Sequence, residues 1–233
     1  MTTSPESADV GRRVRNMRDK QSRIFEAAAS LFAERGFEGV TTQEISDRAD
    51  IAAGTLFRYA SSKGELLLMV YNEDFRSALE LGVRQSQSQP NPAEAVLGMV
   101  RPTVEVADRH VENAMAYQRE LLFGAPTEQY RSEGLALVER LEAMIAQRLA
   151  AAAAERGLDS KSLDKQALLA GRSVFAVLHL IMARPSTGAH PGRDAIGDLR
   201  DQITQIVAGF FAALGDPDDV TGRTSPRGER RKL

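Results

Sequence analysis

The side chains best suited to chemistry in this chain lie between Thr41 and Lys63, and their types suit contact with nucleic acid. Thr41 and Glu44 form a Thr-x-x-Glu pattern, in which each side chain accepts a hydrogen bond from the other residue's backbone amide. Ile45 and Ala49 follow one turn apart on a single face. The pattern therefore predicts a short helix of about two turns that packs against a neighbour.

A second short helix is predicted directly after a turn at residues 50–52. Leu56 points this helix into the same small core, which leaves Thr55, Arg58 and Tyr59 facing outward. Two short helices joined by a tight turn are typical of a helix-turn-helix, whose second helix lies in the DNA major groove. Short amphipathic helix pairs with capping patterns also occur in other all-helical proteins, so the spacing alone leaves a purely structural helix pair open.

Catalytic chemistry has little support in the sequence. The chain has no cysteine and three histidines, and it contains no nucleophile elbow, Walker loop, dinucleotide fingerprint or His-Glu-x-x-His motif. Asp108, His110 and Glu112 stand at alternate positions, which a helix would spread over different faces. We therefore expect no enzyme activity, no cofactor and no metal site.

The stretch from about residue 20 to residue 70 resembles the DNA-binding domain of the tetracycline-repressor (TetR/AcrR) family of bacterial regulators. The shared pattern is a Gly-aromatic step, a Thr-Thr pair, Ile and Ala in the second helix, a small-residue turn, a Gly-x-Leu-aromatic run and a Ser-Lys step. The matching positions here are Gly36, Phe37, Thr41, Thr42, Ile45, Ala49, residues 54–60, Ser62 and Lys63.

Three positions depart from the family pattern. Asp50 stands where the family usually has Gly, at a position expected to need a left-handed backbone, which Asp tolerates. Ala52 replaces the usual Ser or Thr and forfeits a side-chain cap that contributes about 1 kcal/mol. Ala60 replaces an aromatic residue. These changes bear on the rigidity and base preference of the recognition helix rather than on the motif.

The resemblance implies roles in DNA contact. One set of residues matches family positions that meet phosphates, and a second set is expected near base edges, where Arg58 can pair with guanine and Thr55 can meet a thymine methyl group. Phe57 can pack in the core or line the groove. The phosphate set is Thr41, Thr42, Tyr59 and Lys63, and the base-edge set is Gln43, Ala53, Gly54, Thr55 and Arg58.

The distribution of charge supports a DNA-binding role that the total charge does not. Thirty Lys and Arg are balanced by 32 Asp and Glu, for a net charge of −2. Phosphate affinity depends on a local basic face rather than on the whole-chain charge. A basic cluster precedes and enters the first predicted helix, and a second one at residues 223–232 is interpreted as a solvated tail. The first cluster is Arg12, Arg13, Arg15, Arg18, Lys20 and Arg23.

We expect a cytoplasmic protein without a membrane partner. The polar N-terminus lacks the apolar core of a signal peptide, and no apolar run is read as long enough to span a membrane.

The fold class expected is all-α, with about nine helices in total. The first helix is expected over residues 15–35, stopping at Gly36, and the fourth over 63–85; the fourth begins in the motif and ends in the second domain, so it can transmit a tilt. Further helices are expected at 92–109, 110–123, 127–156, 162–184 and 193–214. The predicted domains are a disordered basic arm (1–14), a helix-turn-helix DNA-binding domain (15–66, motif about 43–62), a helical effector-binding and dimerisation domain (67–215) and a disordered basic tail (216–233).

The last two long helices carry apolar residues at steps of three and four, which is typical of a helix-packing seam. Such stripes can bury one side within the chain and the other against a copy, or both sides within the chain. The family resemblance implies a homodimer, whose two recognition helices would read half-sites about 34–36 Å apart in a palindromic operator. The expected dimer contacts are Leu168, Phe175, Leu178, Ile196, Leu199, Ile203, Ile206 and Phe210.

The resemblance also implies a repressor that a small molecule releases from DNA. Apolar residues with a few polar tips are the expected lining of an effector pocket, although ordinary core packing is the more common role for any single one of them. His179 lies among apolar neighbours and must find a partner or stay neutral. The competing functions are an effector-independent architectural DNA-binding protein and, more remotely, a helical enzyme. The pocket candidates are Met99, Met115, Tyr117, Leu122, Phe123, Phe175, His179 and Met182.

Overall fold

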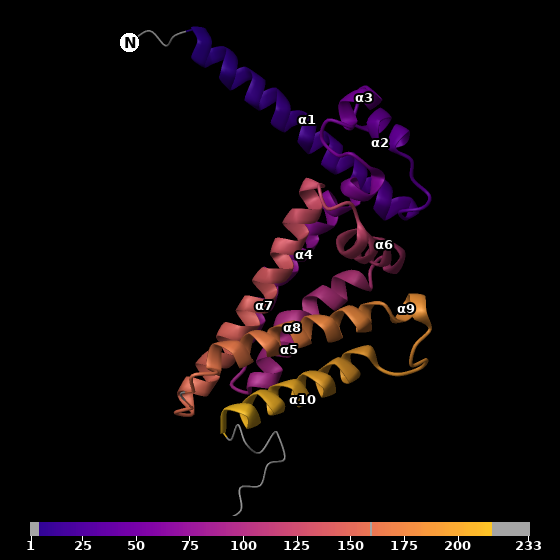
Figure 1. The fold of residues 1–233 in the computed structure, drawn as a ribbon. Helices are drawn as coiled ribbons and strands as arrows, with labels where there is room; N and C mark the ends of the chain where they lie inside the picture. The colour runs from indigo at the N-terminus through magenta and orange to yellow at the C-terminus, as the bar shows by residue number, and fades with distance from the viewer. Residues whose placement is uncertain (1–4, 159, 216–233) are drawn as a thin grey trace, which may run out of the picture. The chain divides into compact units, whose positions relative to one another are not determined.

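A computed structural model describes residues 5–158 and 160–215, with side chains from Arg15 onward. These residues form ten helices and no strand, so the predicted all-α fold class is confirmed (Figure 1). The helices are α1 (Pro5–Arg35), α2 (Thr42–Arg48), α3 (Ala53–Leu56), α4 (Lys63–Gln87), α5 (Pro92–Ala107), α6 (Val111–Phe123), α7 (Gln129–Glu155), α8 (Leu163–Met182), α9 (Arg184–Thr187) and α10 (Ala195–Gly215).

The end of α1 agrees with the sequence prediction, whereas its start does not. The helix ends at Arg35, and Gly36 follows with a φ of +72°, as a glycine after a helix does. It begins at Pro5 rather than near Arg15. Proline suits the first helical position, because its φ is already fixed and no intrahelical partner is needed for its nitrogen. The predicted tail at 216–233 lies outside the described residues.

The described residues contain one helix more than the nine expected. The additional helix is α9, a single turn that begins at the end of the helix predicted at 162–184 and precedes the one predicted at 193–214. Pro185 stands in its first turn, and Gly188 closes it with a φ of +64°. Proline and glycine therefore begin and end a short helix here instead of excluding one.

Two compact units divide the chain. Unit 1 comprises Met1–Glu80, Pro102–Val138 and Met182–Ala189, and unit 2 comprises Leu81–Arg101, Glu139–Ile181 and His190–Leu233. Unit 1 contains the whole predicted DNA-binding domain at 15–66 and adds α6 and the beginning of α7 to it. The functional boundary proposed after residue 66 therefore falls inside a structural unit.

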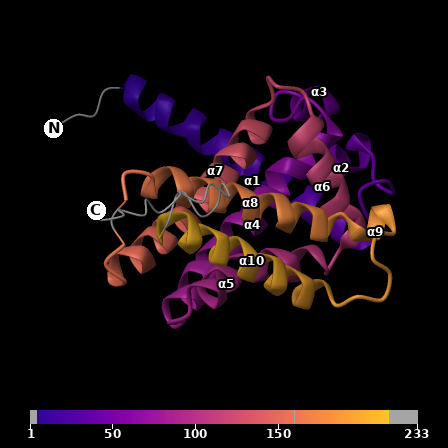
Figure 2. The same ribbon diagram turned by 60° about the horizontal axis from the view of Figure 1, so that its bottom comes forward.

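Apolar side chains fill each unit. In unit 1, α2 and α3 lie beside the second half of α1 (Figure 1), and the buried residues there include Ile24, Phe32, Ile45 and Leu56. In unit 2, α8 and α10 lie side by side in both views (Figure 2). The unit 2 core includes Leu141, Ile145, Leu149, Val174, Leu178, Leu199 and Ile203.

By length and composition, α8 is apolar enough to cross a membrane, which corrects the expectation that no run of the sequence is. A helix of this kind is weak evidence of a membrane-spanning segment, because a core helix of a globular protein can be equally long and apolar. Ala167, Val174, Leu178 and Ile181 of α8 are buried within the chain.

Candidate nucleic-acid interface

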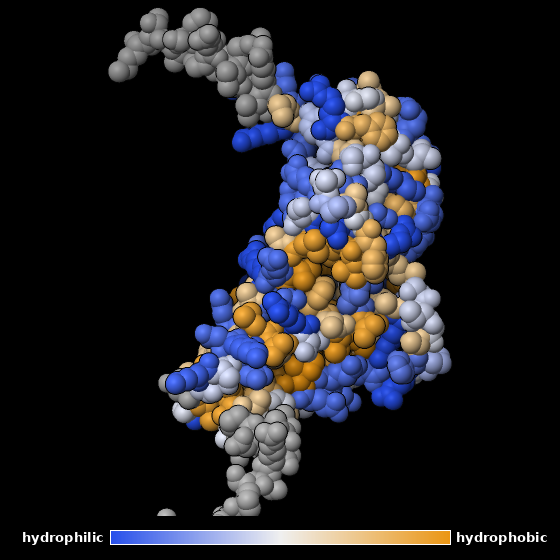
Figure 3. Space-filling view, in the orientation of Figure 1, coloured by the Kyte–Doolittle hydropathy of each residue, from blue (hydrophilic) through white to orange (hydrophobic). Residues whose placement is uncertain are grey.

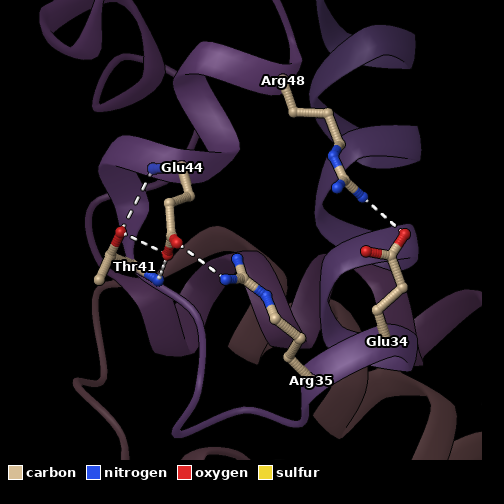
Figure 4. Close-up of polar contacts among 5 residues, drawn as sticks. All are labelled: Glu34, Arg35, Thr41, Glu44 and Arg48. Carbon is tan, nitrogen blue, oxygen red and sulfur yellow. Dashed lines mark hydrogen bonds and ion pairs between the residues drawn. The ribbon is translucent and has the colours of Figure 1, made fainter.

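The start of α2 is fixed by the capping box that the sequence predicts. The Glu44 amide donates to Thr41 Oγ1 at 3.3 Å, and the Thr41 amide donates to Glu44 Oε2 at 2.8 Å (Figure 4). Ile45 is fully buried below this cap. The first helix of the motif is therefore held at its start by polar contacts and on one side by the core.

Two ion pairs join α2 to α1. Arg35 lies 2.9 Å from Glu44, and Arg48 lies 2.7 Å from Glu34 (Figure 4). The Arg35 guanidinium, followed by the Thr41 hydroxyl and amide, lowers the pKa of Glu44 to about 2. The carboxylate is therefore charged at neutral pH and holds the second helix of the domain to the first.

The turn between α2 and α3 depends on Asp50. This residue has a φ of +50°, in the left-handed region that the sequence predicted for it. Arg23 donates to its carbonyl at 3.4 Å and to its carboxylate at 3.5 Å. The turn is thereby tied back to α1, without the glycine usual at this position.

The recognition helix α3 is a single turn. Its N-cap residue, Ala52, makes no side-chain cap, as the sequence indicated. Leu56 and Ala60 are buried and hold the segment to the core. Backbone hydrogen bonds continue the turn past the helix, from the Tyr59 amide to the Leu56 carbonyl at 2.8 Å and from the Ala60 amide to the same carbonyl at 3.2 Å.

Most of the predicted DNA-contact residues reach the surface of unit 1. Phe57 is 50% exposed, so its ring lies outside the core, and its contact with a DNA groove stays a prediction. Gln43 is also exposed but donates to Asp47 at 2.7 Å. Thr41, Gly54 and Arg58 are exposed, whereas Thr42, Ala53, Thr55, Tyr59 and Lys63 are half-buried.

Lys63 directs its charge inward. Its Nζ atom donates to the Phe37 carbonyl at 2.9 Å and lies 4.2 Å from the centre of the Phe37 ring. Cations over an aromatic face are attracted by the ring quadrupole. The ammonium group predicted to meet a phosphate thus has an internal partner already.

The family model for "Bacterial regulatory proteins, tetR family" matches residues 24–70, which are the helices and turns just described. The chain belongs to the TetR family. Members of this family are DNA-binding regulators rather than enzymes.

Relatives of this TetR-family chain are known in sequence and in structure. It is 31% identical over 105 residues to the HTH-type transcriptional repressor KstR2 of Mycobacterium tuberculosis, a match that covers 43% of this chain and 50% of KstR2. It is 38% identical over 58 residues to KstR of the same organism, covering 25% of this chain and 26% of KstR. The chain thus spans half of the first relative's length and less of the second's.

The structural likeness extends further. The crystal structure of Thermus thermophilus FadR, a TetR-family transcriptional repressor in complex with lauroyl-CoA, superposes with a TM-score of 0.59 at 25% identity, covering 89% of this chain and 98% of FadR. A TetR regulator from Rhodococcus sp. RHA1 superposes with a TM-score of 0.61 at 20% identity, covering 82% and 97% of the two chains. The latter likeness concerns the fold alone.

The effector candidates of the TetR-family chain lie in different surroundings. Met99 and Tyr117 are buried, and the Tyr117 hydroxyl donates to Asn72 at 2.9 Å; burial raises the pKa of this tyrosine. Phe123 is 81% exposed, so it does not line an enclosed cavity here. Met115, Leu122, Phe175, His179 and Met182 are half-buried.

His179 lies beside Phe175, with 5.8 Å between the ring centres. Burial lowers the pKa of His179 below its ordinary value, so the imidazole is neutral at pH 7. A neutral ring is one of the two outcomes that the sequence left open for this histidine.

The predicted dimer residues divide by burial. Four of them are buried within the single chain, so these side chains are not available to a second copy. These are Leu178, Leu199, Ile203 and Phe210. Phe175, Ile196 and Ile206 are half-buried, and Leu168 is 43% exposed.

Sequence reasoning missed the part of α6 that contacts the DNA-binding domain at residues 15–66. Asn113 Nδ2 donates to the Phe32 carbonyl at 2.8 Å, and the Glu38 amide donates to Glu112 Oε1 at 3.0 Å. Gly36 lies directly under the Glu112 carboxylate, where a Cβ would come within 2.6 Å of it. No local pattern signals contacts between residues so far apart in the chain.

Proposed function

We propose that this TetR-family protein is a homodimeric transcriptional repressor, which binds a palindromic operator and leaves it when a small molecule binds. The observation that carries the proposal is the outward face of a helix-turn-helix whose inward face is packed. Arg58 and Phe57 are exposed on the recognition segment, while Leu56 beside them is buried. A DNA-bound role also implies a cytoplasmic location.

Repression is supported by the relatives. KstR2, KstR and FadR are each named as repressors, and the FadR structure covers 89% of this chain. The helix-turn-helix alone is compatible with activation as well. The direction of regulation therefore depends on this likeness.

The proposed dimer contact uses the outer faces of α8 and α10. Leu168, Leu169 and Leu180 of α8 are 43%, 44% and 69% exposed. Figure 3 shows apolar residues gathered along these two helices. Large exposed apolar patches are typical of protein interfaces. A pair of chains would also place two recognition helices at successive major grooves on one side of the DNA.

An acyl thioester of coenzyme A is the first effector class to test, because FadR of Thermus thermophilus was solved with lauroyl-CoA. Lauroyl-CoA should release the protein from its operator, whereas lauric acid and coenzyme A added separately should not. Release by neither the thioester nor its parts would contradict this effector class and leave the DNA-binding proposal intact.

The deciding experiment is to select bound fragments from genomic DNA with the purified full-length protein. We expect enrichment of an inverted repeat with half-sites about one duplex turn, 34–36 Å, or a multiple of it apart. The neighbouring genes would then indicate which pathway the effector comes from. Equal affinity for selected and random DNA would instead support an architectural protein that coats DNA without an effector.

A further inference from the structure

A pocket of about 390 Å³ opens beside the recognition segment within unit 1. Its wall is shared by α1, the α3 segment and the beginning of α7, and it includes Lys20, Gln21, Arg58, Tyr59, Gln129 and Tyr130. Small-molecule sites commonly measure about 300–1,000 Å³. The pocket therefore has room for a phosphate group together with an attached sugar or base.

The described residues that line this pocket carry a net positive charge. Lys20 and Arg58 supply two cations, and no Asp or Glu is among the described residues that line it. Within the described part of the chain, neither cation makes an ion pair or a hydrogen bond. Three nearby arginines do form ion pairs: Arg23, Arg35 and Arg48 each lie beside a carboxylate.

The far wall of the pocket is held in place by Tyr130. Gln21 Nε2 donates to its hydroxyl at 3.2 Å, and Asn72 Nδ2 donates to its carbonyl at 2.7 Å. The Tyr130 amide points to Glu65 Oε1 at 3.4 Å. Because the residue is buried and tied to α1 and α4, the pocket is formed before any ligand arrives.

Two cations flanked by hydroxyl and amide donors are the groups that recognise phosphate esters. We propose that this pocket is a phosphate-ester site, which takes a backbone phosphate of the DNA that α3 reads or, in the absence of DNA, the phosphate group of a small molecule. The DNA source rests on the proposed function above. Arg58 has five N–H donors, so it can serve a base edge and this pocket together.

Two substitutions test the site in the full-length protein. Lys20→Gln removes one of the cations, and Gln21→Glu adds a carboxylate to the wall while the Tyr130 hydroxyl can still donate to it. Lys161→Gln and Gln147→Glu are matched controls, because they make the same charge changes at exposed positions outside the pocket.

The first readout is DNA affinity over a range of salt. Lys20→Gln should flatten the slope of log K against log salt by about one unit, and Gln21→Glu should weaken binding about tenfold at low salt. Both effects should be equal on selected and random duplexes, because a phosphate contact carries no base information.

The second readout is calorimetric titration with inorganic pyrophosphate at constant ionic strength, without DNA. Binding by the parent and both controls, lost in Lys20→Gln and Gln21→Glu, supports a free phosphate ester as occupant. Effects confined to the DNA readout support the DNA backbone as the source. If both pocket variants match their controls in both readouts, the proposal is wrong. If the parent protein binds pyrophosphate but no DNA, the proposed function is wrong and the proposal of a phosphate site in this pocket is still supported.

Discussion

Arg58 is the residue that we propose for base recognition. It is exposed, and it follows Phe57, which is half exposed, on a segment held inward by Leu56. An arginine in this position can donate two hydrogen bonds to guanine in the major groove.

Replacing Arg58 with alanine should relax the sequence preference at one base position, by about 1–3 kcal/mol. Competition binding with operators that carry single base changes measures this directly. Arg140→Ala, an exposed arginine of unit 2, is the control and should bind like the parent. Equal weakening on every sequence would assign Arg58 to phosphate contact alone.

Lys63 has a structural task that its match to a phosphate-contacting position did not reveal. Its ammonium donates to the Phe37 carbonyl, a residue 26 positions away in the chain. Lys63→Met should therefore lower the stability by about 1–2 kcal/mol, the contribution of a hydrogen bond from a charged group that is partly exposed.

Thermal unfolding of Lys63→Met should show a fall in Tm of a few degrees, about 2–4 °C per kcal/mol for a protein of this size. The exposed Lys161→Met is the control and should leave the Tm unchanged. An unchanged Tm together with a flatter salt dependence of DNA binding would show that the lysine acts on phosphate after all.

The Glu44 carboxylate makes the stability of the DNA-binding helices sensitive to acid. Its pKa is lowered to about 2 by Arg35 and Thr41, so the folded protein holds the charged form more strongly than the unfolded chain does. The resulting stability is fully present above the ordinary pKa of a glutamate and is lost as the pH falls towards 2.

Glu44→Gln should therefore destabilise the protein at pH 7 and differ progressively less from the parent as the pH is lowered from about 4.5. Tm measured against pH gives both curves, and added salt should narrow the gap between them because both partners are exposed. Parallel curves throughout this range would contradict the assignment.

At the scale of elements, local patterns predicted most of the fold. The capping box at Thr41, the left-handed Asp50 and the missing cap at Ala52 all have causes within a few residues, and all three are confirmed. The contacts of Asn113 with Phe32 and of Lys63 with Phe37 depend on how distant segments pack. Propensity and periodicity contain no information about such pairs.

The crossing of α4 and α5 in unit 2 depends on a glycine. A Cβ on Gly82 would lie 2.2 Å from the Met99 carbonyl oxygen, closer than any real contact. Gly98 lies at the same helix pair, but a Cβ there would meet its nearest atom at 3.5 Å, an ordinary contact. Both glycines are therefore helical, but only Gly98 has room for a Cβ atom.

Gly82→Ala should destabilise the protein by about 1–2 kcal/mol, because overpacking outweighs the gain in helix propensity. Gly98→Ala should gain up to about 1 kcal/mol from that same propensity. Chemical denaturation of the two variants beside the parent measures both. Equal effects of the two substitutions would show that α4 and α5 do not cross this closely.

At the scale of the whole molecule, the proposed assembly predicts that a charge on the outer face of α8 separates the copies. Leu180→Glu should convert dimers to monomers at micromolar concentration, because Leu180 is 69% exposed in the single chain and the fold does not need it. Phe123→Glu is the control, since it charges another exposed apolar residue outside α8 and α10.

Light scattering coupled to size-exclusion chromatography reads the mass of each variant. The Leu180→Glu monomer should also lose most of its operator affinity, because each half-site is then bound independently. A parent protein that is monomeric at every concentration would remove the basis for a palindromic operator.

The contacts of α6 with the DNA-binding domain limit how such proteins can be recombined. The Phe32 carbonyl and the Glu38 amide find their partners on Asn113 and Glu112, far outside residues 15–66. A chimera that grafts those residues onto the body of a relative would leave both groups to whatever side chains that body offers there. DNA specificity is therefore better exchanged by altering the outward residues of α2 and α3 than by transplanting the entire head.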